Sequence, residues 1–318
     1  MLAACAPAAE LTLIVQPTQG QHFLSMPHGS SAYARPQLST FWEDLKQHLT
    51  ELTLAVYHHE GKAQHLQSLG MLTALQKLKF DGRTPPSGAG GSAVVGKPPH
   101  CSLPGKKLAL SLPHLTSLRL SGLKAGAIVL SCPKLAEISL VDTQLLRLKI
   151  EDAALESLVL YQCEPVQFAL KSPETQLQKL RSLSVRHCSE AGRHLIQDIS
   201  QMSSLQTLCY GNFAAACMPS SFPQGLQDVS LSPDDWCLNL PEGLEELHEL
   251  REFRFNTPRR PWEFTVPLAS LLPVHSLERV GVAHHRYQRR DESKWKELDE
   301  QTLGVIKNQG PWIPWDHW

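Results

Sequence analysis

One stretch of the chain, Gly91-Ser-Ala-Val-Val-Gly96-Lys97, has the skeleton of a phosphate-binding loop, in which backbone amides and a lysine surround a phosphate. The next residue of such a loop is a serine or threonine that holds magnesium, but here it is Pro98. Pro98 and Pro99 also forbid the helix whose N-terminus would bind the phosphate. The stretch therefore predicts no nucleotide site.

Three cysteines, Cys132, Cys163 and Cys188, are candidate metal ligands because thiolates bind zinc. Zinc-binding cysteines commonly come in Cys-x-x-Cys pairs, and the sequence contains no such pair. The spacings of 31 and 25 residues match repeat lengths instead. We therefore expect no metal and no cofactor, and interpret the three thiols as a ladder of small buried residues at the turn after a strand.

Catalytic motifs are absent from the sequence. The 15 histidines are scattered, and the adjacent pairs His58-His59 and His284-His285 do not share one face of a helix or strand. Neither the Gly-x-Ser-x-Gly elbow of hydrolases nor the His-Glu-x-x-His zinc motif occurs. The chain is therefore predicted not to be an enzyme.

A hydrophobic–x–hydrophobic triplet recurs every ten residues between positions 107 and 170. Alternate side chains leave a strand on opposite faces, so each triplet predicts a very short strand with two inward residues. Alternate triplets belong to a fuller frame whose anchors Leu118, Ile138 and Leu158 lie 20 residues apart, a period within the leucine-rich-repeat range. The seven triplets begin at Leu108, Leu118, Ile128, Ile138, Leu148, Leu158 and Phe168.

These repeats predict an α/β solenoid, a leucine-rich-repeat horseshoe with a parallel sheet on its concave face. In the ten-residue stretch, the second triplet of each coil should form a second short strand opposite the first. Helical spacing and a capping box predict helices at 40–49, 61–69 and 191–202. The convex side is therefore expected to mix short strands with helices.

The chain divides into four predicted parts. Residues 1–82 are N-terminal repeats, although 17–38 look like a loop because they are rich in proline and glycine. Residues 83–106 are rich in Gly, Pro and Ser and are expected to be a disordered insertion, since they bury too little apolar surface. The repeat array covers 107–283. Residues 284–318 form a helix and a tail with three of the seven tryptophans, which closes the end of the array or docks on a partner.

Composition limits the classes of partner and the cellular compartment. A net charge of −1 gives no global attraction to nucleic acid or to an acidic membrane. No apolar run approaches the length of a membrane span, and the N-terminus lacks the charged region of a signal peptide. Eight cysteines in a chain of 318 residues do not suggest a disulfide framework. We predict a cytoplasmic protein, with the nucleus as the alternative.

Two segments, Leu155–Cys163 and Leu180–Cys188, match the frame Leu-x-x-Leu-x-Leu-x-x-Cys, with valine at one of the leucine positions in the second. Cys132-Pro133-Lys-Leu135 supplies the companion Cys-Pro-x-Leu element. With these elements the chain resembles the cysteine-containing repeats of plant-type F-box/leucine-rich-repeat proteins. The resemblance implies that the repeats recognise substrates for an SCF-type ubiquitin ligase. Residues 1–50 show a repeat-like strand and one helix in place of an F-box.

Residues that lie between and beside the inward leucines should line one long surface. Mixed charge with an aromatic residue suits protein recognition better than a phosphate backbone, which calls for dominant lysine and arginine. We predict a non-enzymatic module that binds a protein partner, without nucleic acid, membrane or small-molecule substrate. The alternative to ligase substrate recognition is a scaffold in a larger intracellular complex. The predicted partner-binding residues are Arg119, Glu137, Tyr161, Arg186, Asp228, Glu252, Arg254, Asn256 and Arg279.

Overall fold

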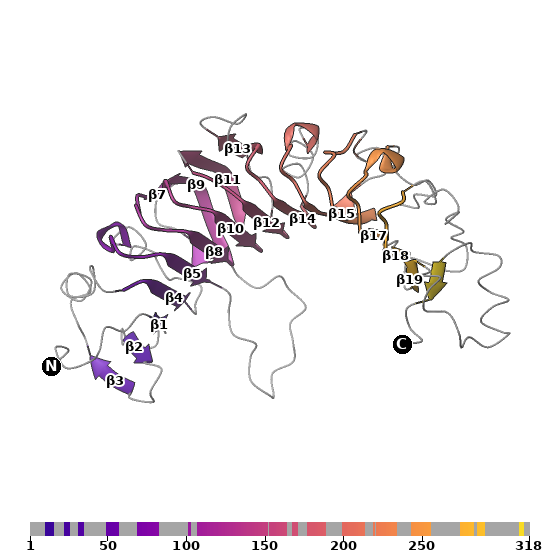
Figure 1. Cartoon of the computed structure of the whole chain (residues 1–318). Coiled ribbons are helices and arrows are strands. Elements are labelled where there is room, and N and C mark those ends of the chain that lie inside the picture. Colours follow the sequence, from indigo (N-terminus) through magenta and orange to yellow (C-terminus); the bar gives the residue numbers. More distant parts are fainter. Residues whose placement is uncertain are drawn as a thin grey trace. The chain divides into compact units, whose positions relative to one another are not determined.

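A computed structural model of the chain contains two compact units, Met1–Leu177 with Cys188–Ala191, and Gln178–His187 with Gly192–Trp318. Figure 1 shows the strands of both units along the chain. The horseshoe expected for the whole array concerns both units together and stays a prediction. The structure describes residues 10–15, 22–25, 31–34, 49–56, 69–82, 101–102, 107–151, 153–163, 167–170, 177–188, 199–213, 219, 221–233, 243–255, 274–282, 285–289 and 312–314.

Tight turns precede most strands, and the spacing of three between apolar residues explains them. The amide of Leu75 donates to the carbonyl of Leu72 at 3.1 Å, and the amide of Leu205 donates to that of Met202 at 2.9 Å. A bond to the third residue back places every third side chain on the same side of the turn. Leu72, Leu75 and Leu78 accordingly all point inward and are at most 1% exposed.

The long sheet of the first unit consists of parallel strands that follow each other along the chain. In spatial order they are β1 (Glu10–Val15), β4 (Glu51–Val56), β5 (Lys77–Asp81), β8 (Ser117–Ser121), β10 (Glu137–Val141) and β12 (Ser157–Tyr161). Beyond β1, the strands β2 (His22–Ser25) and β3 (Ser31–Ala34) continue the sheet in antiparallel order. The expected loop at 17–38 is therefore wrong for these two segments.

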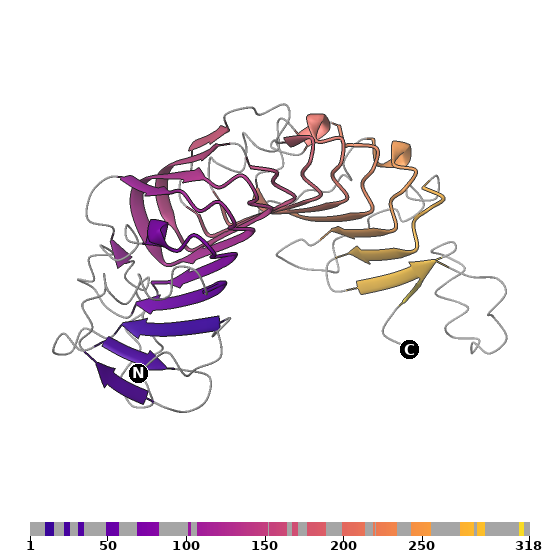
Figure 2. The same ribbon diagram turned by 60° about the vertical axis from the view of Figure 1, so that its left-hand side comes forward.

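A second, short sheet lies opposite the long sheet within the first unit (Figure 2). Its strands are β6 (Cys101–Ser102), β7 (Lys107–Leu110), β9 (Leu123–Ser131), β11 (Gln144–Glu151) and β13 (Gln167–Leu170). Ile128 pairs with Leu148, and Leu148 with Phe168, so the predicted second strand of each coil is confirmed. Cys101 and Ser102 belong to the expected insertion but pair with β9. The other residues of 83–106 lie outside the described part of the chain.

The second unit has its own run of parallel strands. They are β14 (Ser182–Arg186), β15 (Thr207–Phe213), β16 (Asp228–Pro233), β17 (Glu252–Phe255) and β18 (Arg279–Val282). Two antiparallel strands, β19 (His285–Arg289) and β20 (Trp312–Pro314), extend the sheet beyond β18. The tail strand β20 thus lies at the end of this sheet, and its role as a closing segment or as a docking segment stays a prediction.

The convex side was expected to contain both short strands and helices, and the structure does not support the helices. The helical elements with described bounds are three 3-10 turns of three residues each: η3 (Leu69–Met71), η4 (Ile199–Gln201) and η6 (Leu244–Glu246). Connections this short form a single tight turn before the chain enters the next strand. The expected helices at 40–49, 61–69 and 191–202 lie mostly outside the described residues. Within the described residues no helix is long and apolar enough to cross a membrane.

Two backbone corners recur from coil to coil. Before each strand, one carbonyl accepts two amides of the next coil: that of Thr116 accepts the amides of Ala136 and Glu137 at 2.9 and 3.0 Å. After the strand comes a left-handed residue, such as Asp142 with φ 50°, whose amide donates to the carbonyl of Tyr161 at 2.7 Å. The left-handed residues that follow a long-sheet strand in the described part of the chain are Gly122, Asp142, Gln162 and His187. Each turns the residue that follows it into the core.

Replacing Gln162 by glycine should stabilise the first unit. Gln162 is exposed and has φ 54°, a conformation that costs a non-glycine residue about 1 kcal/mol. After the entropy cost of glycine, we expect a net gain of about 0.5 kcal/mol. The matched control is Gln76→Gly, at an exposed corner residue outside the described positive-φ positions, which should lose about 0.5–1 kcal/mol. Urea unfolding measures both, and two losses of similar size would contradict the strain.

Candidate functional site

The long-sheet strands whose side chains are described, from β4 to β18, present an alternating set of accessible and buried side chains. In β5, Leu78 and Phe80 are 1% exposed and point inward, whereas Lys77 and Lys79 are exposed on the opposite side. The strands pair in register, so outward residues of successive coils align in rows across the sheet. We call the outward residues of β4 to β12 the first face, and those of β14 to β18 the second face.

Three of the predicted partner-binding residues lie on the first face. Arg119 and Glu137 are exposed on β8 and β10, and Tyr161 is half-buried at the end of β12. They occupy three different rows, since Arg119 aligns with Ser139 and Tyr161 aligns with Val141. The structure places these residues on one face but does not bring them into one cluster.

The second face gathers the predicted residues more closely. Asp228, Glu252 and Arg279 align in one row across β16, β17 and β18. Arg254 is exposed one row further along β17, and Arg186 is exposed at the end of β14. Asn256 lies outside the described residues.

Glu252 holds two arginines on the second face. Its Oε2 lies 2.8 Å from Nη2 of Arg279, and its Oε1 forms an ion pair and a hydrogen bond with Arg254 on the same strand. The Glu252 side chain is 12% exposed, whereas those of Arg254 and Arg279 are 58% and 40% exposed. A partly buried carboxylate therefore orients two cationic side chains that solvent reaches.

Glycine residues make room for two arginines of this face. A Cβ atom on Gly281 would lie 3.3 Å from Cγ of Arg254, and one on Gly211 would lie 3.4 Å from Cγ of Arg186. Each arginine side chain therefore crosses the strand beside its own at a position without a side chain. Sequence reasoning missed these glycines, which only the pairing of β14 with β15 and β17 with β18 identifies.

Sequence reasoning also missed residues of the first face. Lys79 lies directly opposite Arg119, and Val141 and Val159 lie beside Tyr161. The signal for Lys79 was present, because it is the middle residue of the Leu78-x-Phe80 triplet and must point outward when its neighbours point inward.

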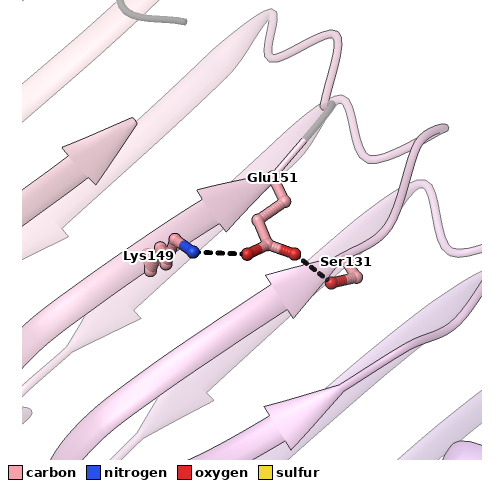
Figure 3. Close-up of polar contacts among 3 residues, drawn as sticks. All are labelled: Ser131, Lys149 and Glu151. Carbon is pink, nitrogen blue, oxygen red and sulfur yellow. Dashed lines mark hydrogen bonds and ion pairs between the residues drawn. The ribbon is translucent and has the colours of Figure 1, made fainter. Parts of the chain in front are cut away.

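A serine, a carboxylate and a lysine meet on the outer side of the short sheet (Figure 3). Ser131 Oγ donates to Glu151 Oε2 at 2.6 Å, and Lys149 Nζ donates to Oε1 of the same carboxylate at 2.6 Å. The lysine stabilises the charged carboxylate, so Glu151 is a poor base for activating the serine. Ser131 lies on β9 and Glu151 on β11, and their bond ties two neighbouring coils together.

All three thiols are buried just after a strand, as expected, but Cys132 does not belong to the same ladder as the other two. Cys163 and Cys188 follow the left-handed corner after a long-sheet strand, as Thr143 does. Cys132 instead follows β9 of the short sheet, where its thiol donates to the carbonyl of Leu110 at 3.8 Å. Both corners turn a small side chain inward, which explains why the sequence pattern did not separate them. Burial raises the pKa of the Cys132 thiol.

Several polar groups surround the Cys163 thiol. A hydrogen bond from Cys188 and one from Thr143 lower the pKa of Cys163 to about 7, although burial opposes them. The Thr143 hydroxyl lies 3.2 Å from its Sγ. Cys163 is only 1% exposed, so a substrate does not reach this thiol without opening the coil. Within the described ranges, no group of three or more His, Cys, Asp or Glu side chains is placed to hold a metal ion.

Comparison with known proteins gives a likeness at the level of the fold. No family model and no curated protein matches the chain. One similar solved structure is a leucine-rich-repeat protein of Leptospira interrogans, with 16% identity over 76% of this chain and 68% of that one. The TM-score between the two is 0.36. The parallel strands and the repeat period make the chain a parallel-sheet solenoid with leucine-rich repeats.

Replacing Glu252 by glutamine should destabilise the second unit, because two arginines lose their shared carboxylate. We expect a loss of about 1 kcal/mol, modest because solvent screens both arginines. The loss should shrink in salt on the order of 1 M. Glu246→Gln is the control, since Glu246 is exposed and makes no ion pair with any described residue. Urea unfolding of both variants at two salt concentrations measures the effect; a salt-independent loss would argue against the ion pairs.

Proposed function

We propose that this chain is a non-enzymatic module that binds a protein partner on its long-sheet faces. The observation that carries the proposal is the alternation of buried and accessible residues in register across successive coils. It presents side chains in rows on a backbone whose hydrogen bonds are already used between coils. Such a surface is pre-organised, so a partner does not have to supply the ordering entropy of the site.

The charges of both faces favour a protein over a nucleic acid. Carboxylates alternate with cations on the first face, where Glu51 and Glu137 share a row with Lys77. Asp228 and Glu252 accompany the arginines of the second face. A phosphate backbone requires rows of uncompensated lysine and arginine, and these acidic residues would repel it.

The finer proposal is substrate recognition for an SCF-type ubiquitin ligase, with a scaffold of a larger complex as the rival. The two Leu-x-x-Leu-x-Leu-x-x-Cys frames favour the ligase, because they resemble the repeats of F-box/leucine-rich-repeat proteins. A tagged pull-down from the native source separates the two proposals. Co-purification of the adaptor of the ligase core supports the ligase; stable partners without this adaptor support the scaffold. A cytoplasmic or nuclear location stays a prediction from the sequence.

Alanine at Tyr161 or at Arg254 should weaken capture of the native partner at least fivefold, because buried aromatic and arginine side chains dominate protein interfaces. Tyr161→Ala touches no inward leucine, so its unfolding midpoint should stay close to that of the parent chain. Arg254→Ala removes one of the two ion pairs of Glu252 and should lose part of the stability expected to be lost in Glu252→Gln, while the chain stays folded. The matched controls are Leu146→Ala and Arg147→Ala, at exposed positions of β11 on the short sheet. Unchanged capture by both long-sheet variants would exclude these faces as the binding surface.

A further inference from the structure

The corner that follows a long-sheet strand turns a small polar side chain into the core at three places. Thr143, Cys163 and Cys188 each come directly after a left-handed residue, and all three are at most 6% exposed. Thr143 and Cys163 occupy equivalent positions of neighbouring coils, because Val141 pairs with Tyr161 two residues before them. The corners therefore stack these side chains in one buried row.

Neighbouring side chains of this row are in contact. The Oγ1 atom of Thr143 lies 3.2 Å from Sγ of Cys163, and either atom can donate the hydrogen bond. Cys188 belongs to the same compact unit as Cys163, and its thiol donates a hydrogen bond to the Cys163 sulfur. Two thiols therefore lie against each other, although they are distant in the sequence.

The spacing of the coils suits a disulfide between the two cysteines. Equivalent residues of neighbouring coils lie about 4.8 Å apart, the distance between parallel strands. The Cα atoms of a disulfide commonly lie about 4.4–6.8 Å apart. Two thiols that point inward from equivalent corners therefore have the backbone separation that a disulfide requires.

The surroundings of Cys163 make it the nucleophile of the pair. A thiol reacts with an oxidant as its thiolate, so a lowered pKa raises the reactive fraction at neutral pH. The hydrogen bond from Cys188 and the one from Thr143 lower the pKa of Cys163 to about 7, against the opposing effect of burial. Cys132 provides the contrast in the same unit, because burial raises the pKa of its thiol, which donates to the carbonyl of Leu110.

We propose that Cys163 and Cys188 form a redox-sensitive site, at which a peroxide converts two buried thiols into a disulfide between neighbouring coils. The Cys163 thiolate attacks one oxygen of hydrogen peroxide and breaks the O–O bond, which gives a sulfenic acid and hydroxide. The hydroxide takes up the proton that Cys163 released on ionisation. The Cys188 thiol then attacks the sulfenic sulfur, and its proton leaves with the sulfenic oxygen as water. Two thiols and one peroxide thus give one disulfide and two waters.

Burial slows this reaction without preventing it. Cys163 is 1% exposed, so hydrogen peroxide, which is little larger than water, reaches the sulfur when the coil opens locally. The disulfide then closes the loop between residues 163 and 188 and restricts the unfolded chain, which stabilises the oxidised form. In a reducing compartment such a bond is transient and serves as a redox sensor. The inference goes beyond the proposed binding function and does not depend on it.

The first test exposes the reduced full chain to hydrogen peroxide. N-ethylmaleimide added during unfolding blocks the remaining thiols, and mass spectrometry of a proteolytic digest maps the disulfides. The bond between Cys163 and Cys188 should be about tenfold more abundant than any other pairing of the eight cysteines. The same oxidation in denaturing urea is the control and should lose this preference, because only the fold brings the two thiols together. An equal preference in both conditions, or a Cys163 that stays reduced while other cysteines oxidise, overturns the inference.

Variants separate the roles of the two thiols. Cys188→Ala should leave Cys163 as a sulfenic acid that dimedone labels during unfolding, or as the sulfinic acid that further oxidation gives. Cys132→Ala is the matched control at another buried cysteine and should leave the yield of the disulfide unchanged. Dimedone on Cys132 as abundant as on Cys163 would show that neither thiol is activated, against the inference.

Thermal unfolding gives a readout that does not depend on labelling. Peroxide treatment should raise the unfolding midpoint of the parent chain by about 5 °C, because the closed loop restricts the unfolded state. The shift should be reversed by dithiothreitol and should be lost in Cys188→Ala. A shift of the same size in Cys188→Ala would mean that another oxidation causes it, and the inference would be wrong.

Discussion

The bond pattern on which the structure depends is the carbonyl that accepts two amides from the following coil. In the first unit it belongs to Thr50, Gln76, Thr116 and Ala136, and in the second unit to Arg181, Gln206, Gln227 and Arg251. It sits just before the strand and fixes where the next strand begins relative to the one before. Equivalent residues of successive coils therefore stack. The core stacks leucine on leucine, and the outward positions form rows at the spacing of parallel strands, about 4.8 Å.

Rows of this kind have a consequence for binding energy. A charged side chain that already has a partner in the next coil must lose that partner before it gains another, so the exchange yields little. Lys77 already forms an ion pair with Glu51, and Glu252 already forms ion pairs with two arginines, so these side chains gain little from a partner protein. A charged group without an ion-pair partner gives up only its hydration on binding, so it gains more from an opposite charge on the partner. On a repeat surface, the charged side chains that contribute most to binding are thus those without an ion-pair partner in the neighbouring coil.

The buried positions of this fold were predictable because they follow from periods of two and three along the chain. The ten-residue triplets placed the strands of both sheets correctly, since each strand needs only two inward residues. The corners were less predictable. Left-handed geometry favours glycine and aspartate, as at Gly122 and Asp142, but Gln162 and His187 adopt it because the preceding strand and the buried cysteine that follows impose it. Strands β2 and β3 were missed because a proline- and glycine-rich segment forms strands only when a sheet edge is offered to it.

The outward half was predictable only in part, and the reason lies in the pairing of coils. Arg119 and Tyr161 were predicted as binding residues from their charge and aromaticity. Their contribution to binding also depends on the residue opposite them on the neighbouring strand, and that residue is distant in the chain. Lys79 and Arg119 are 40 positions apart, with the 83–106 segment and β7 between them. A register counted from the ten-residue triplets does not reach back across this segment. Because β5 pairs directly with β8, the two cations become neighbours on one face, and this neighbourhood follows from the pairing rather than from the spacing along the chain.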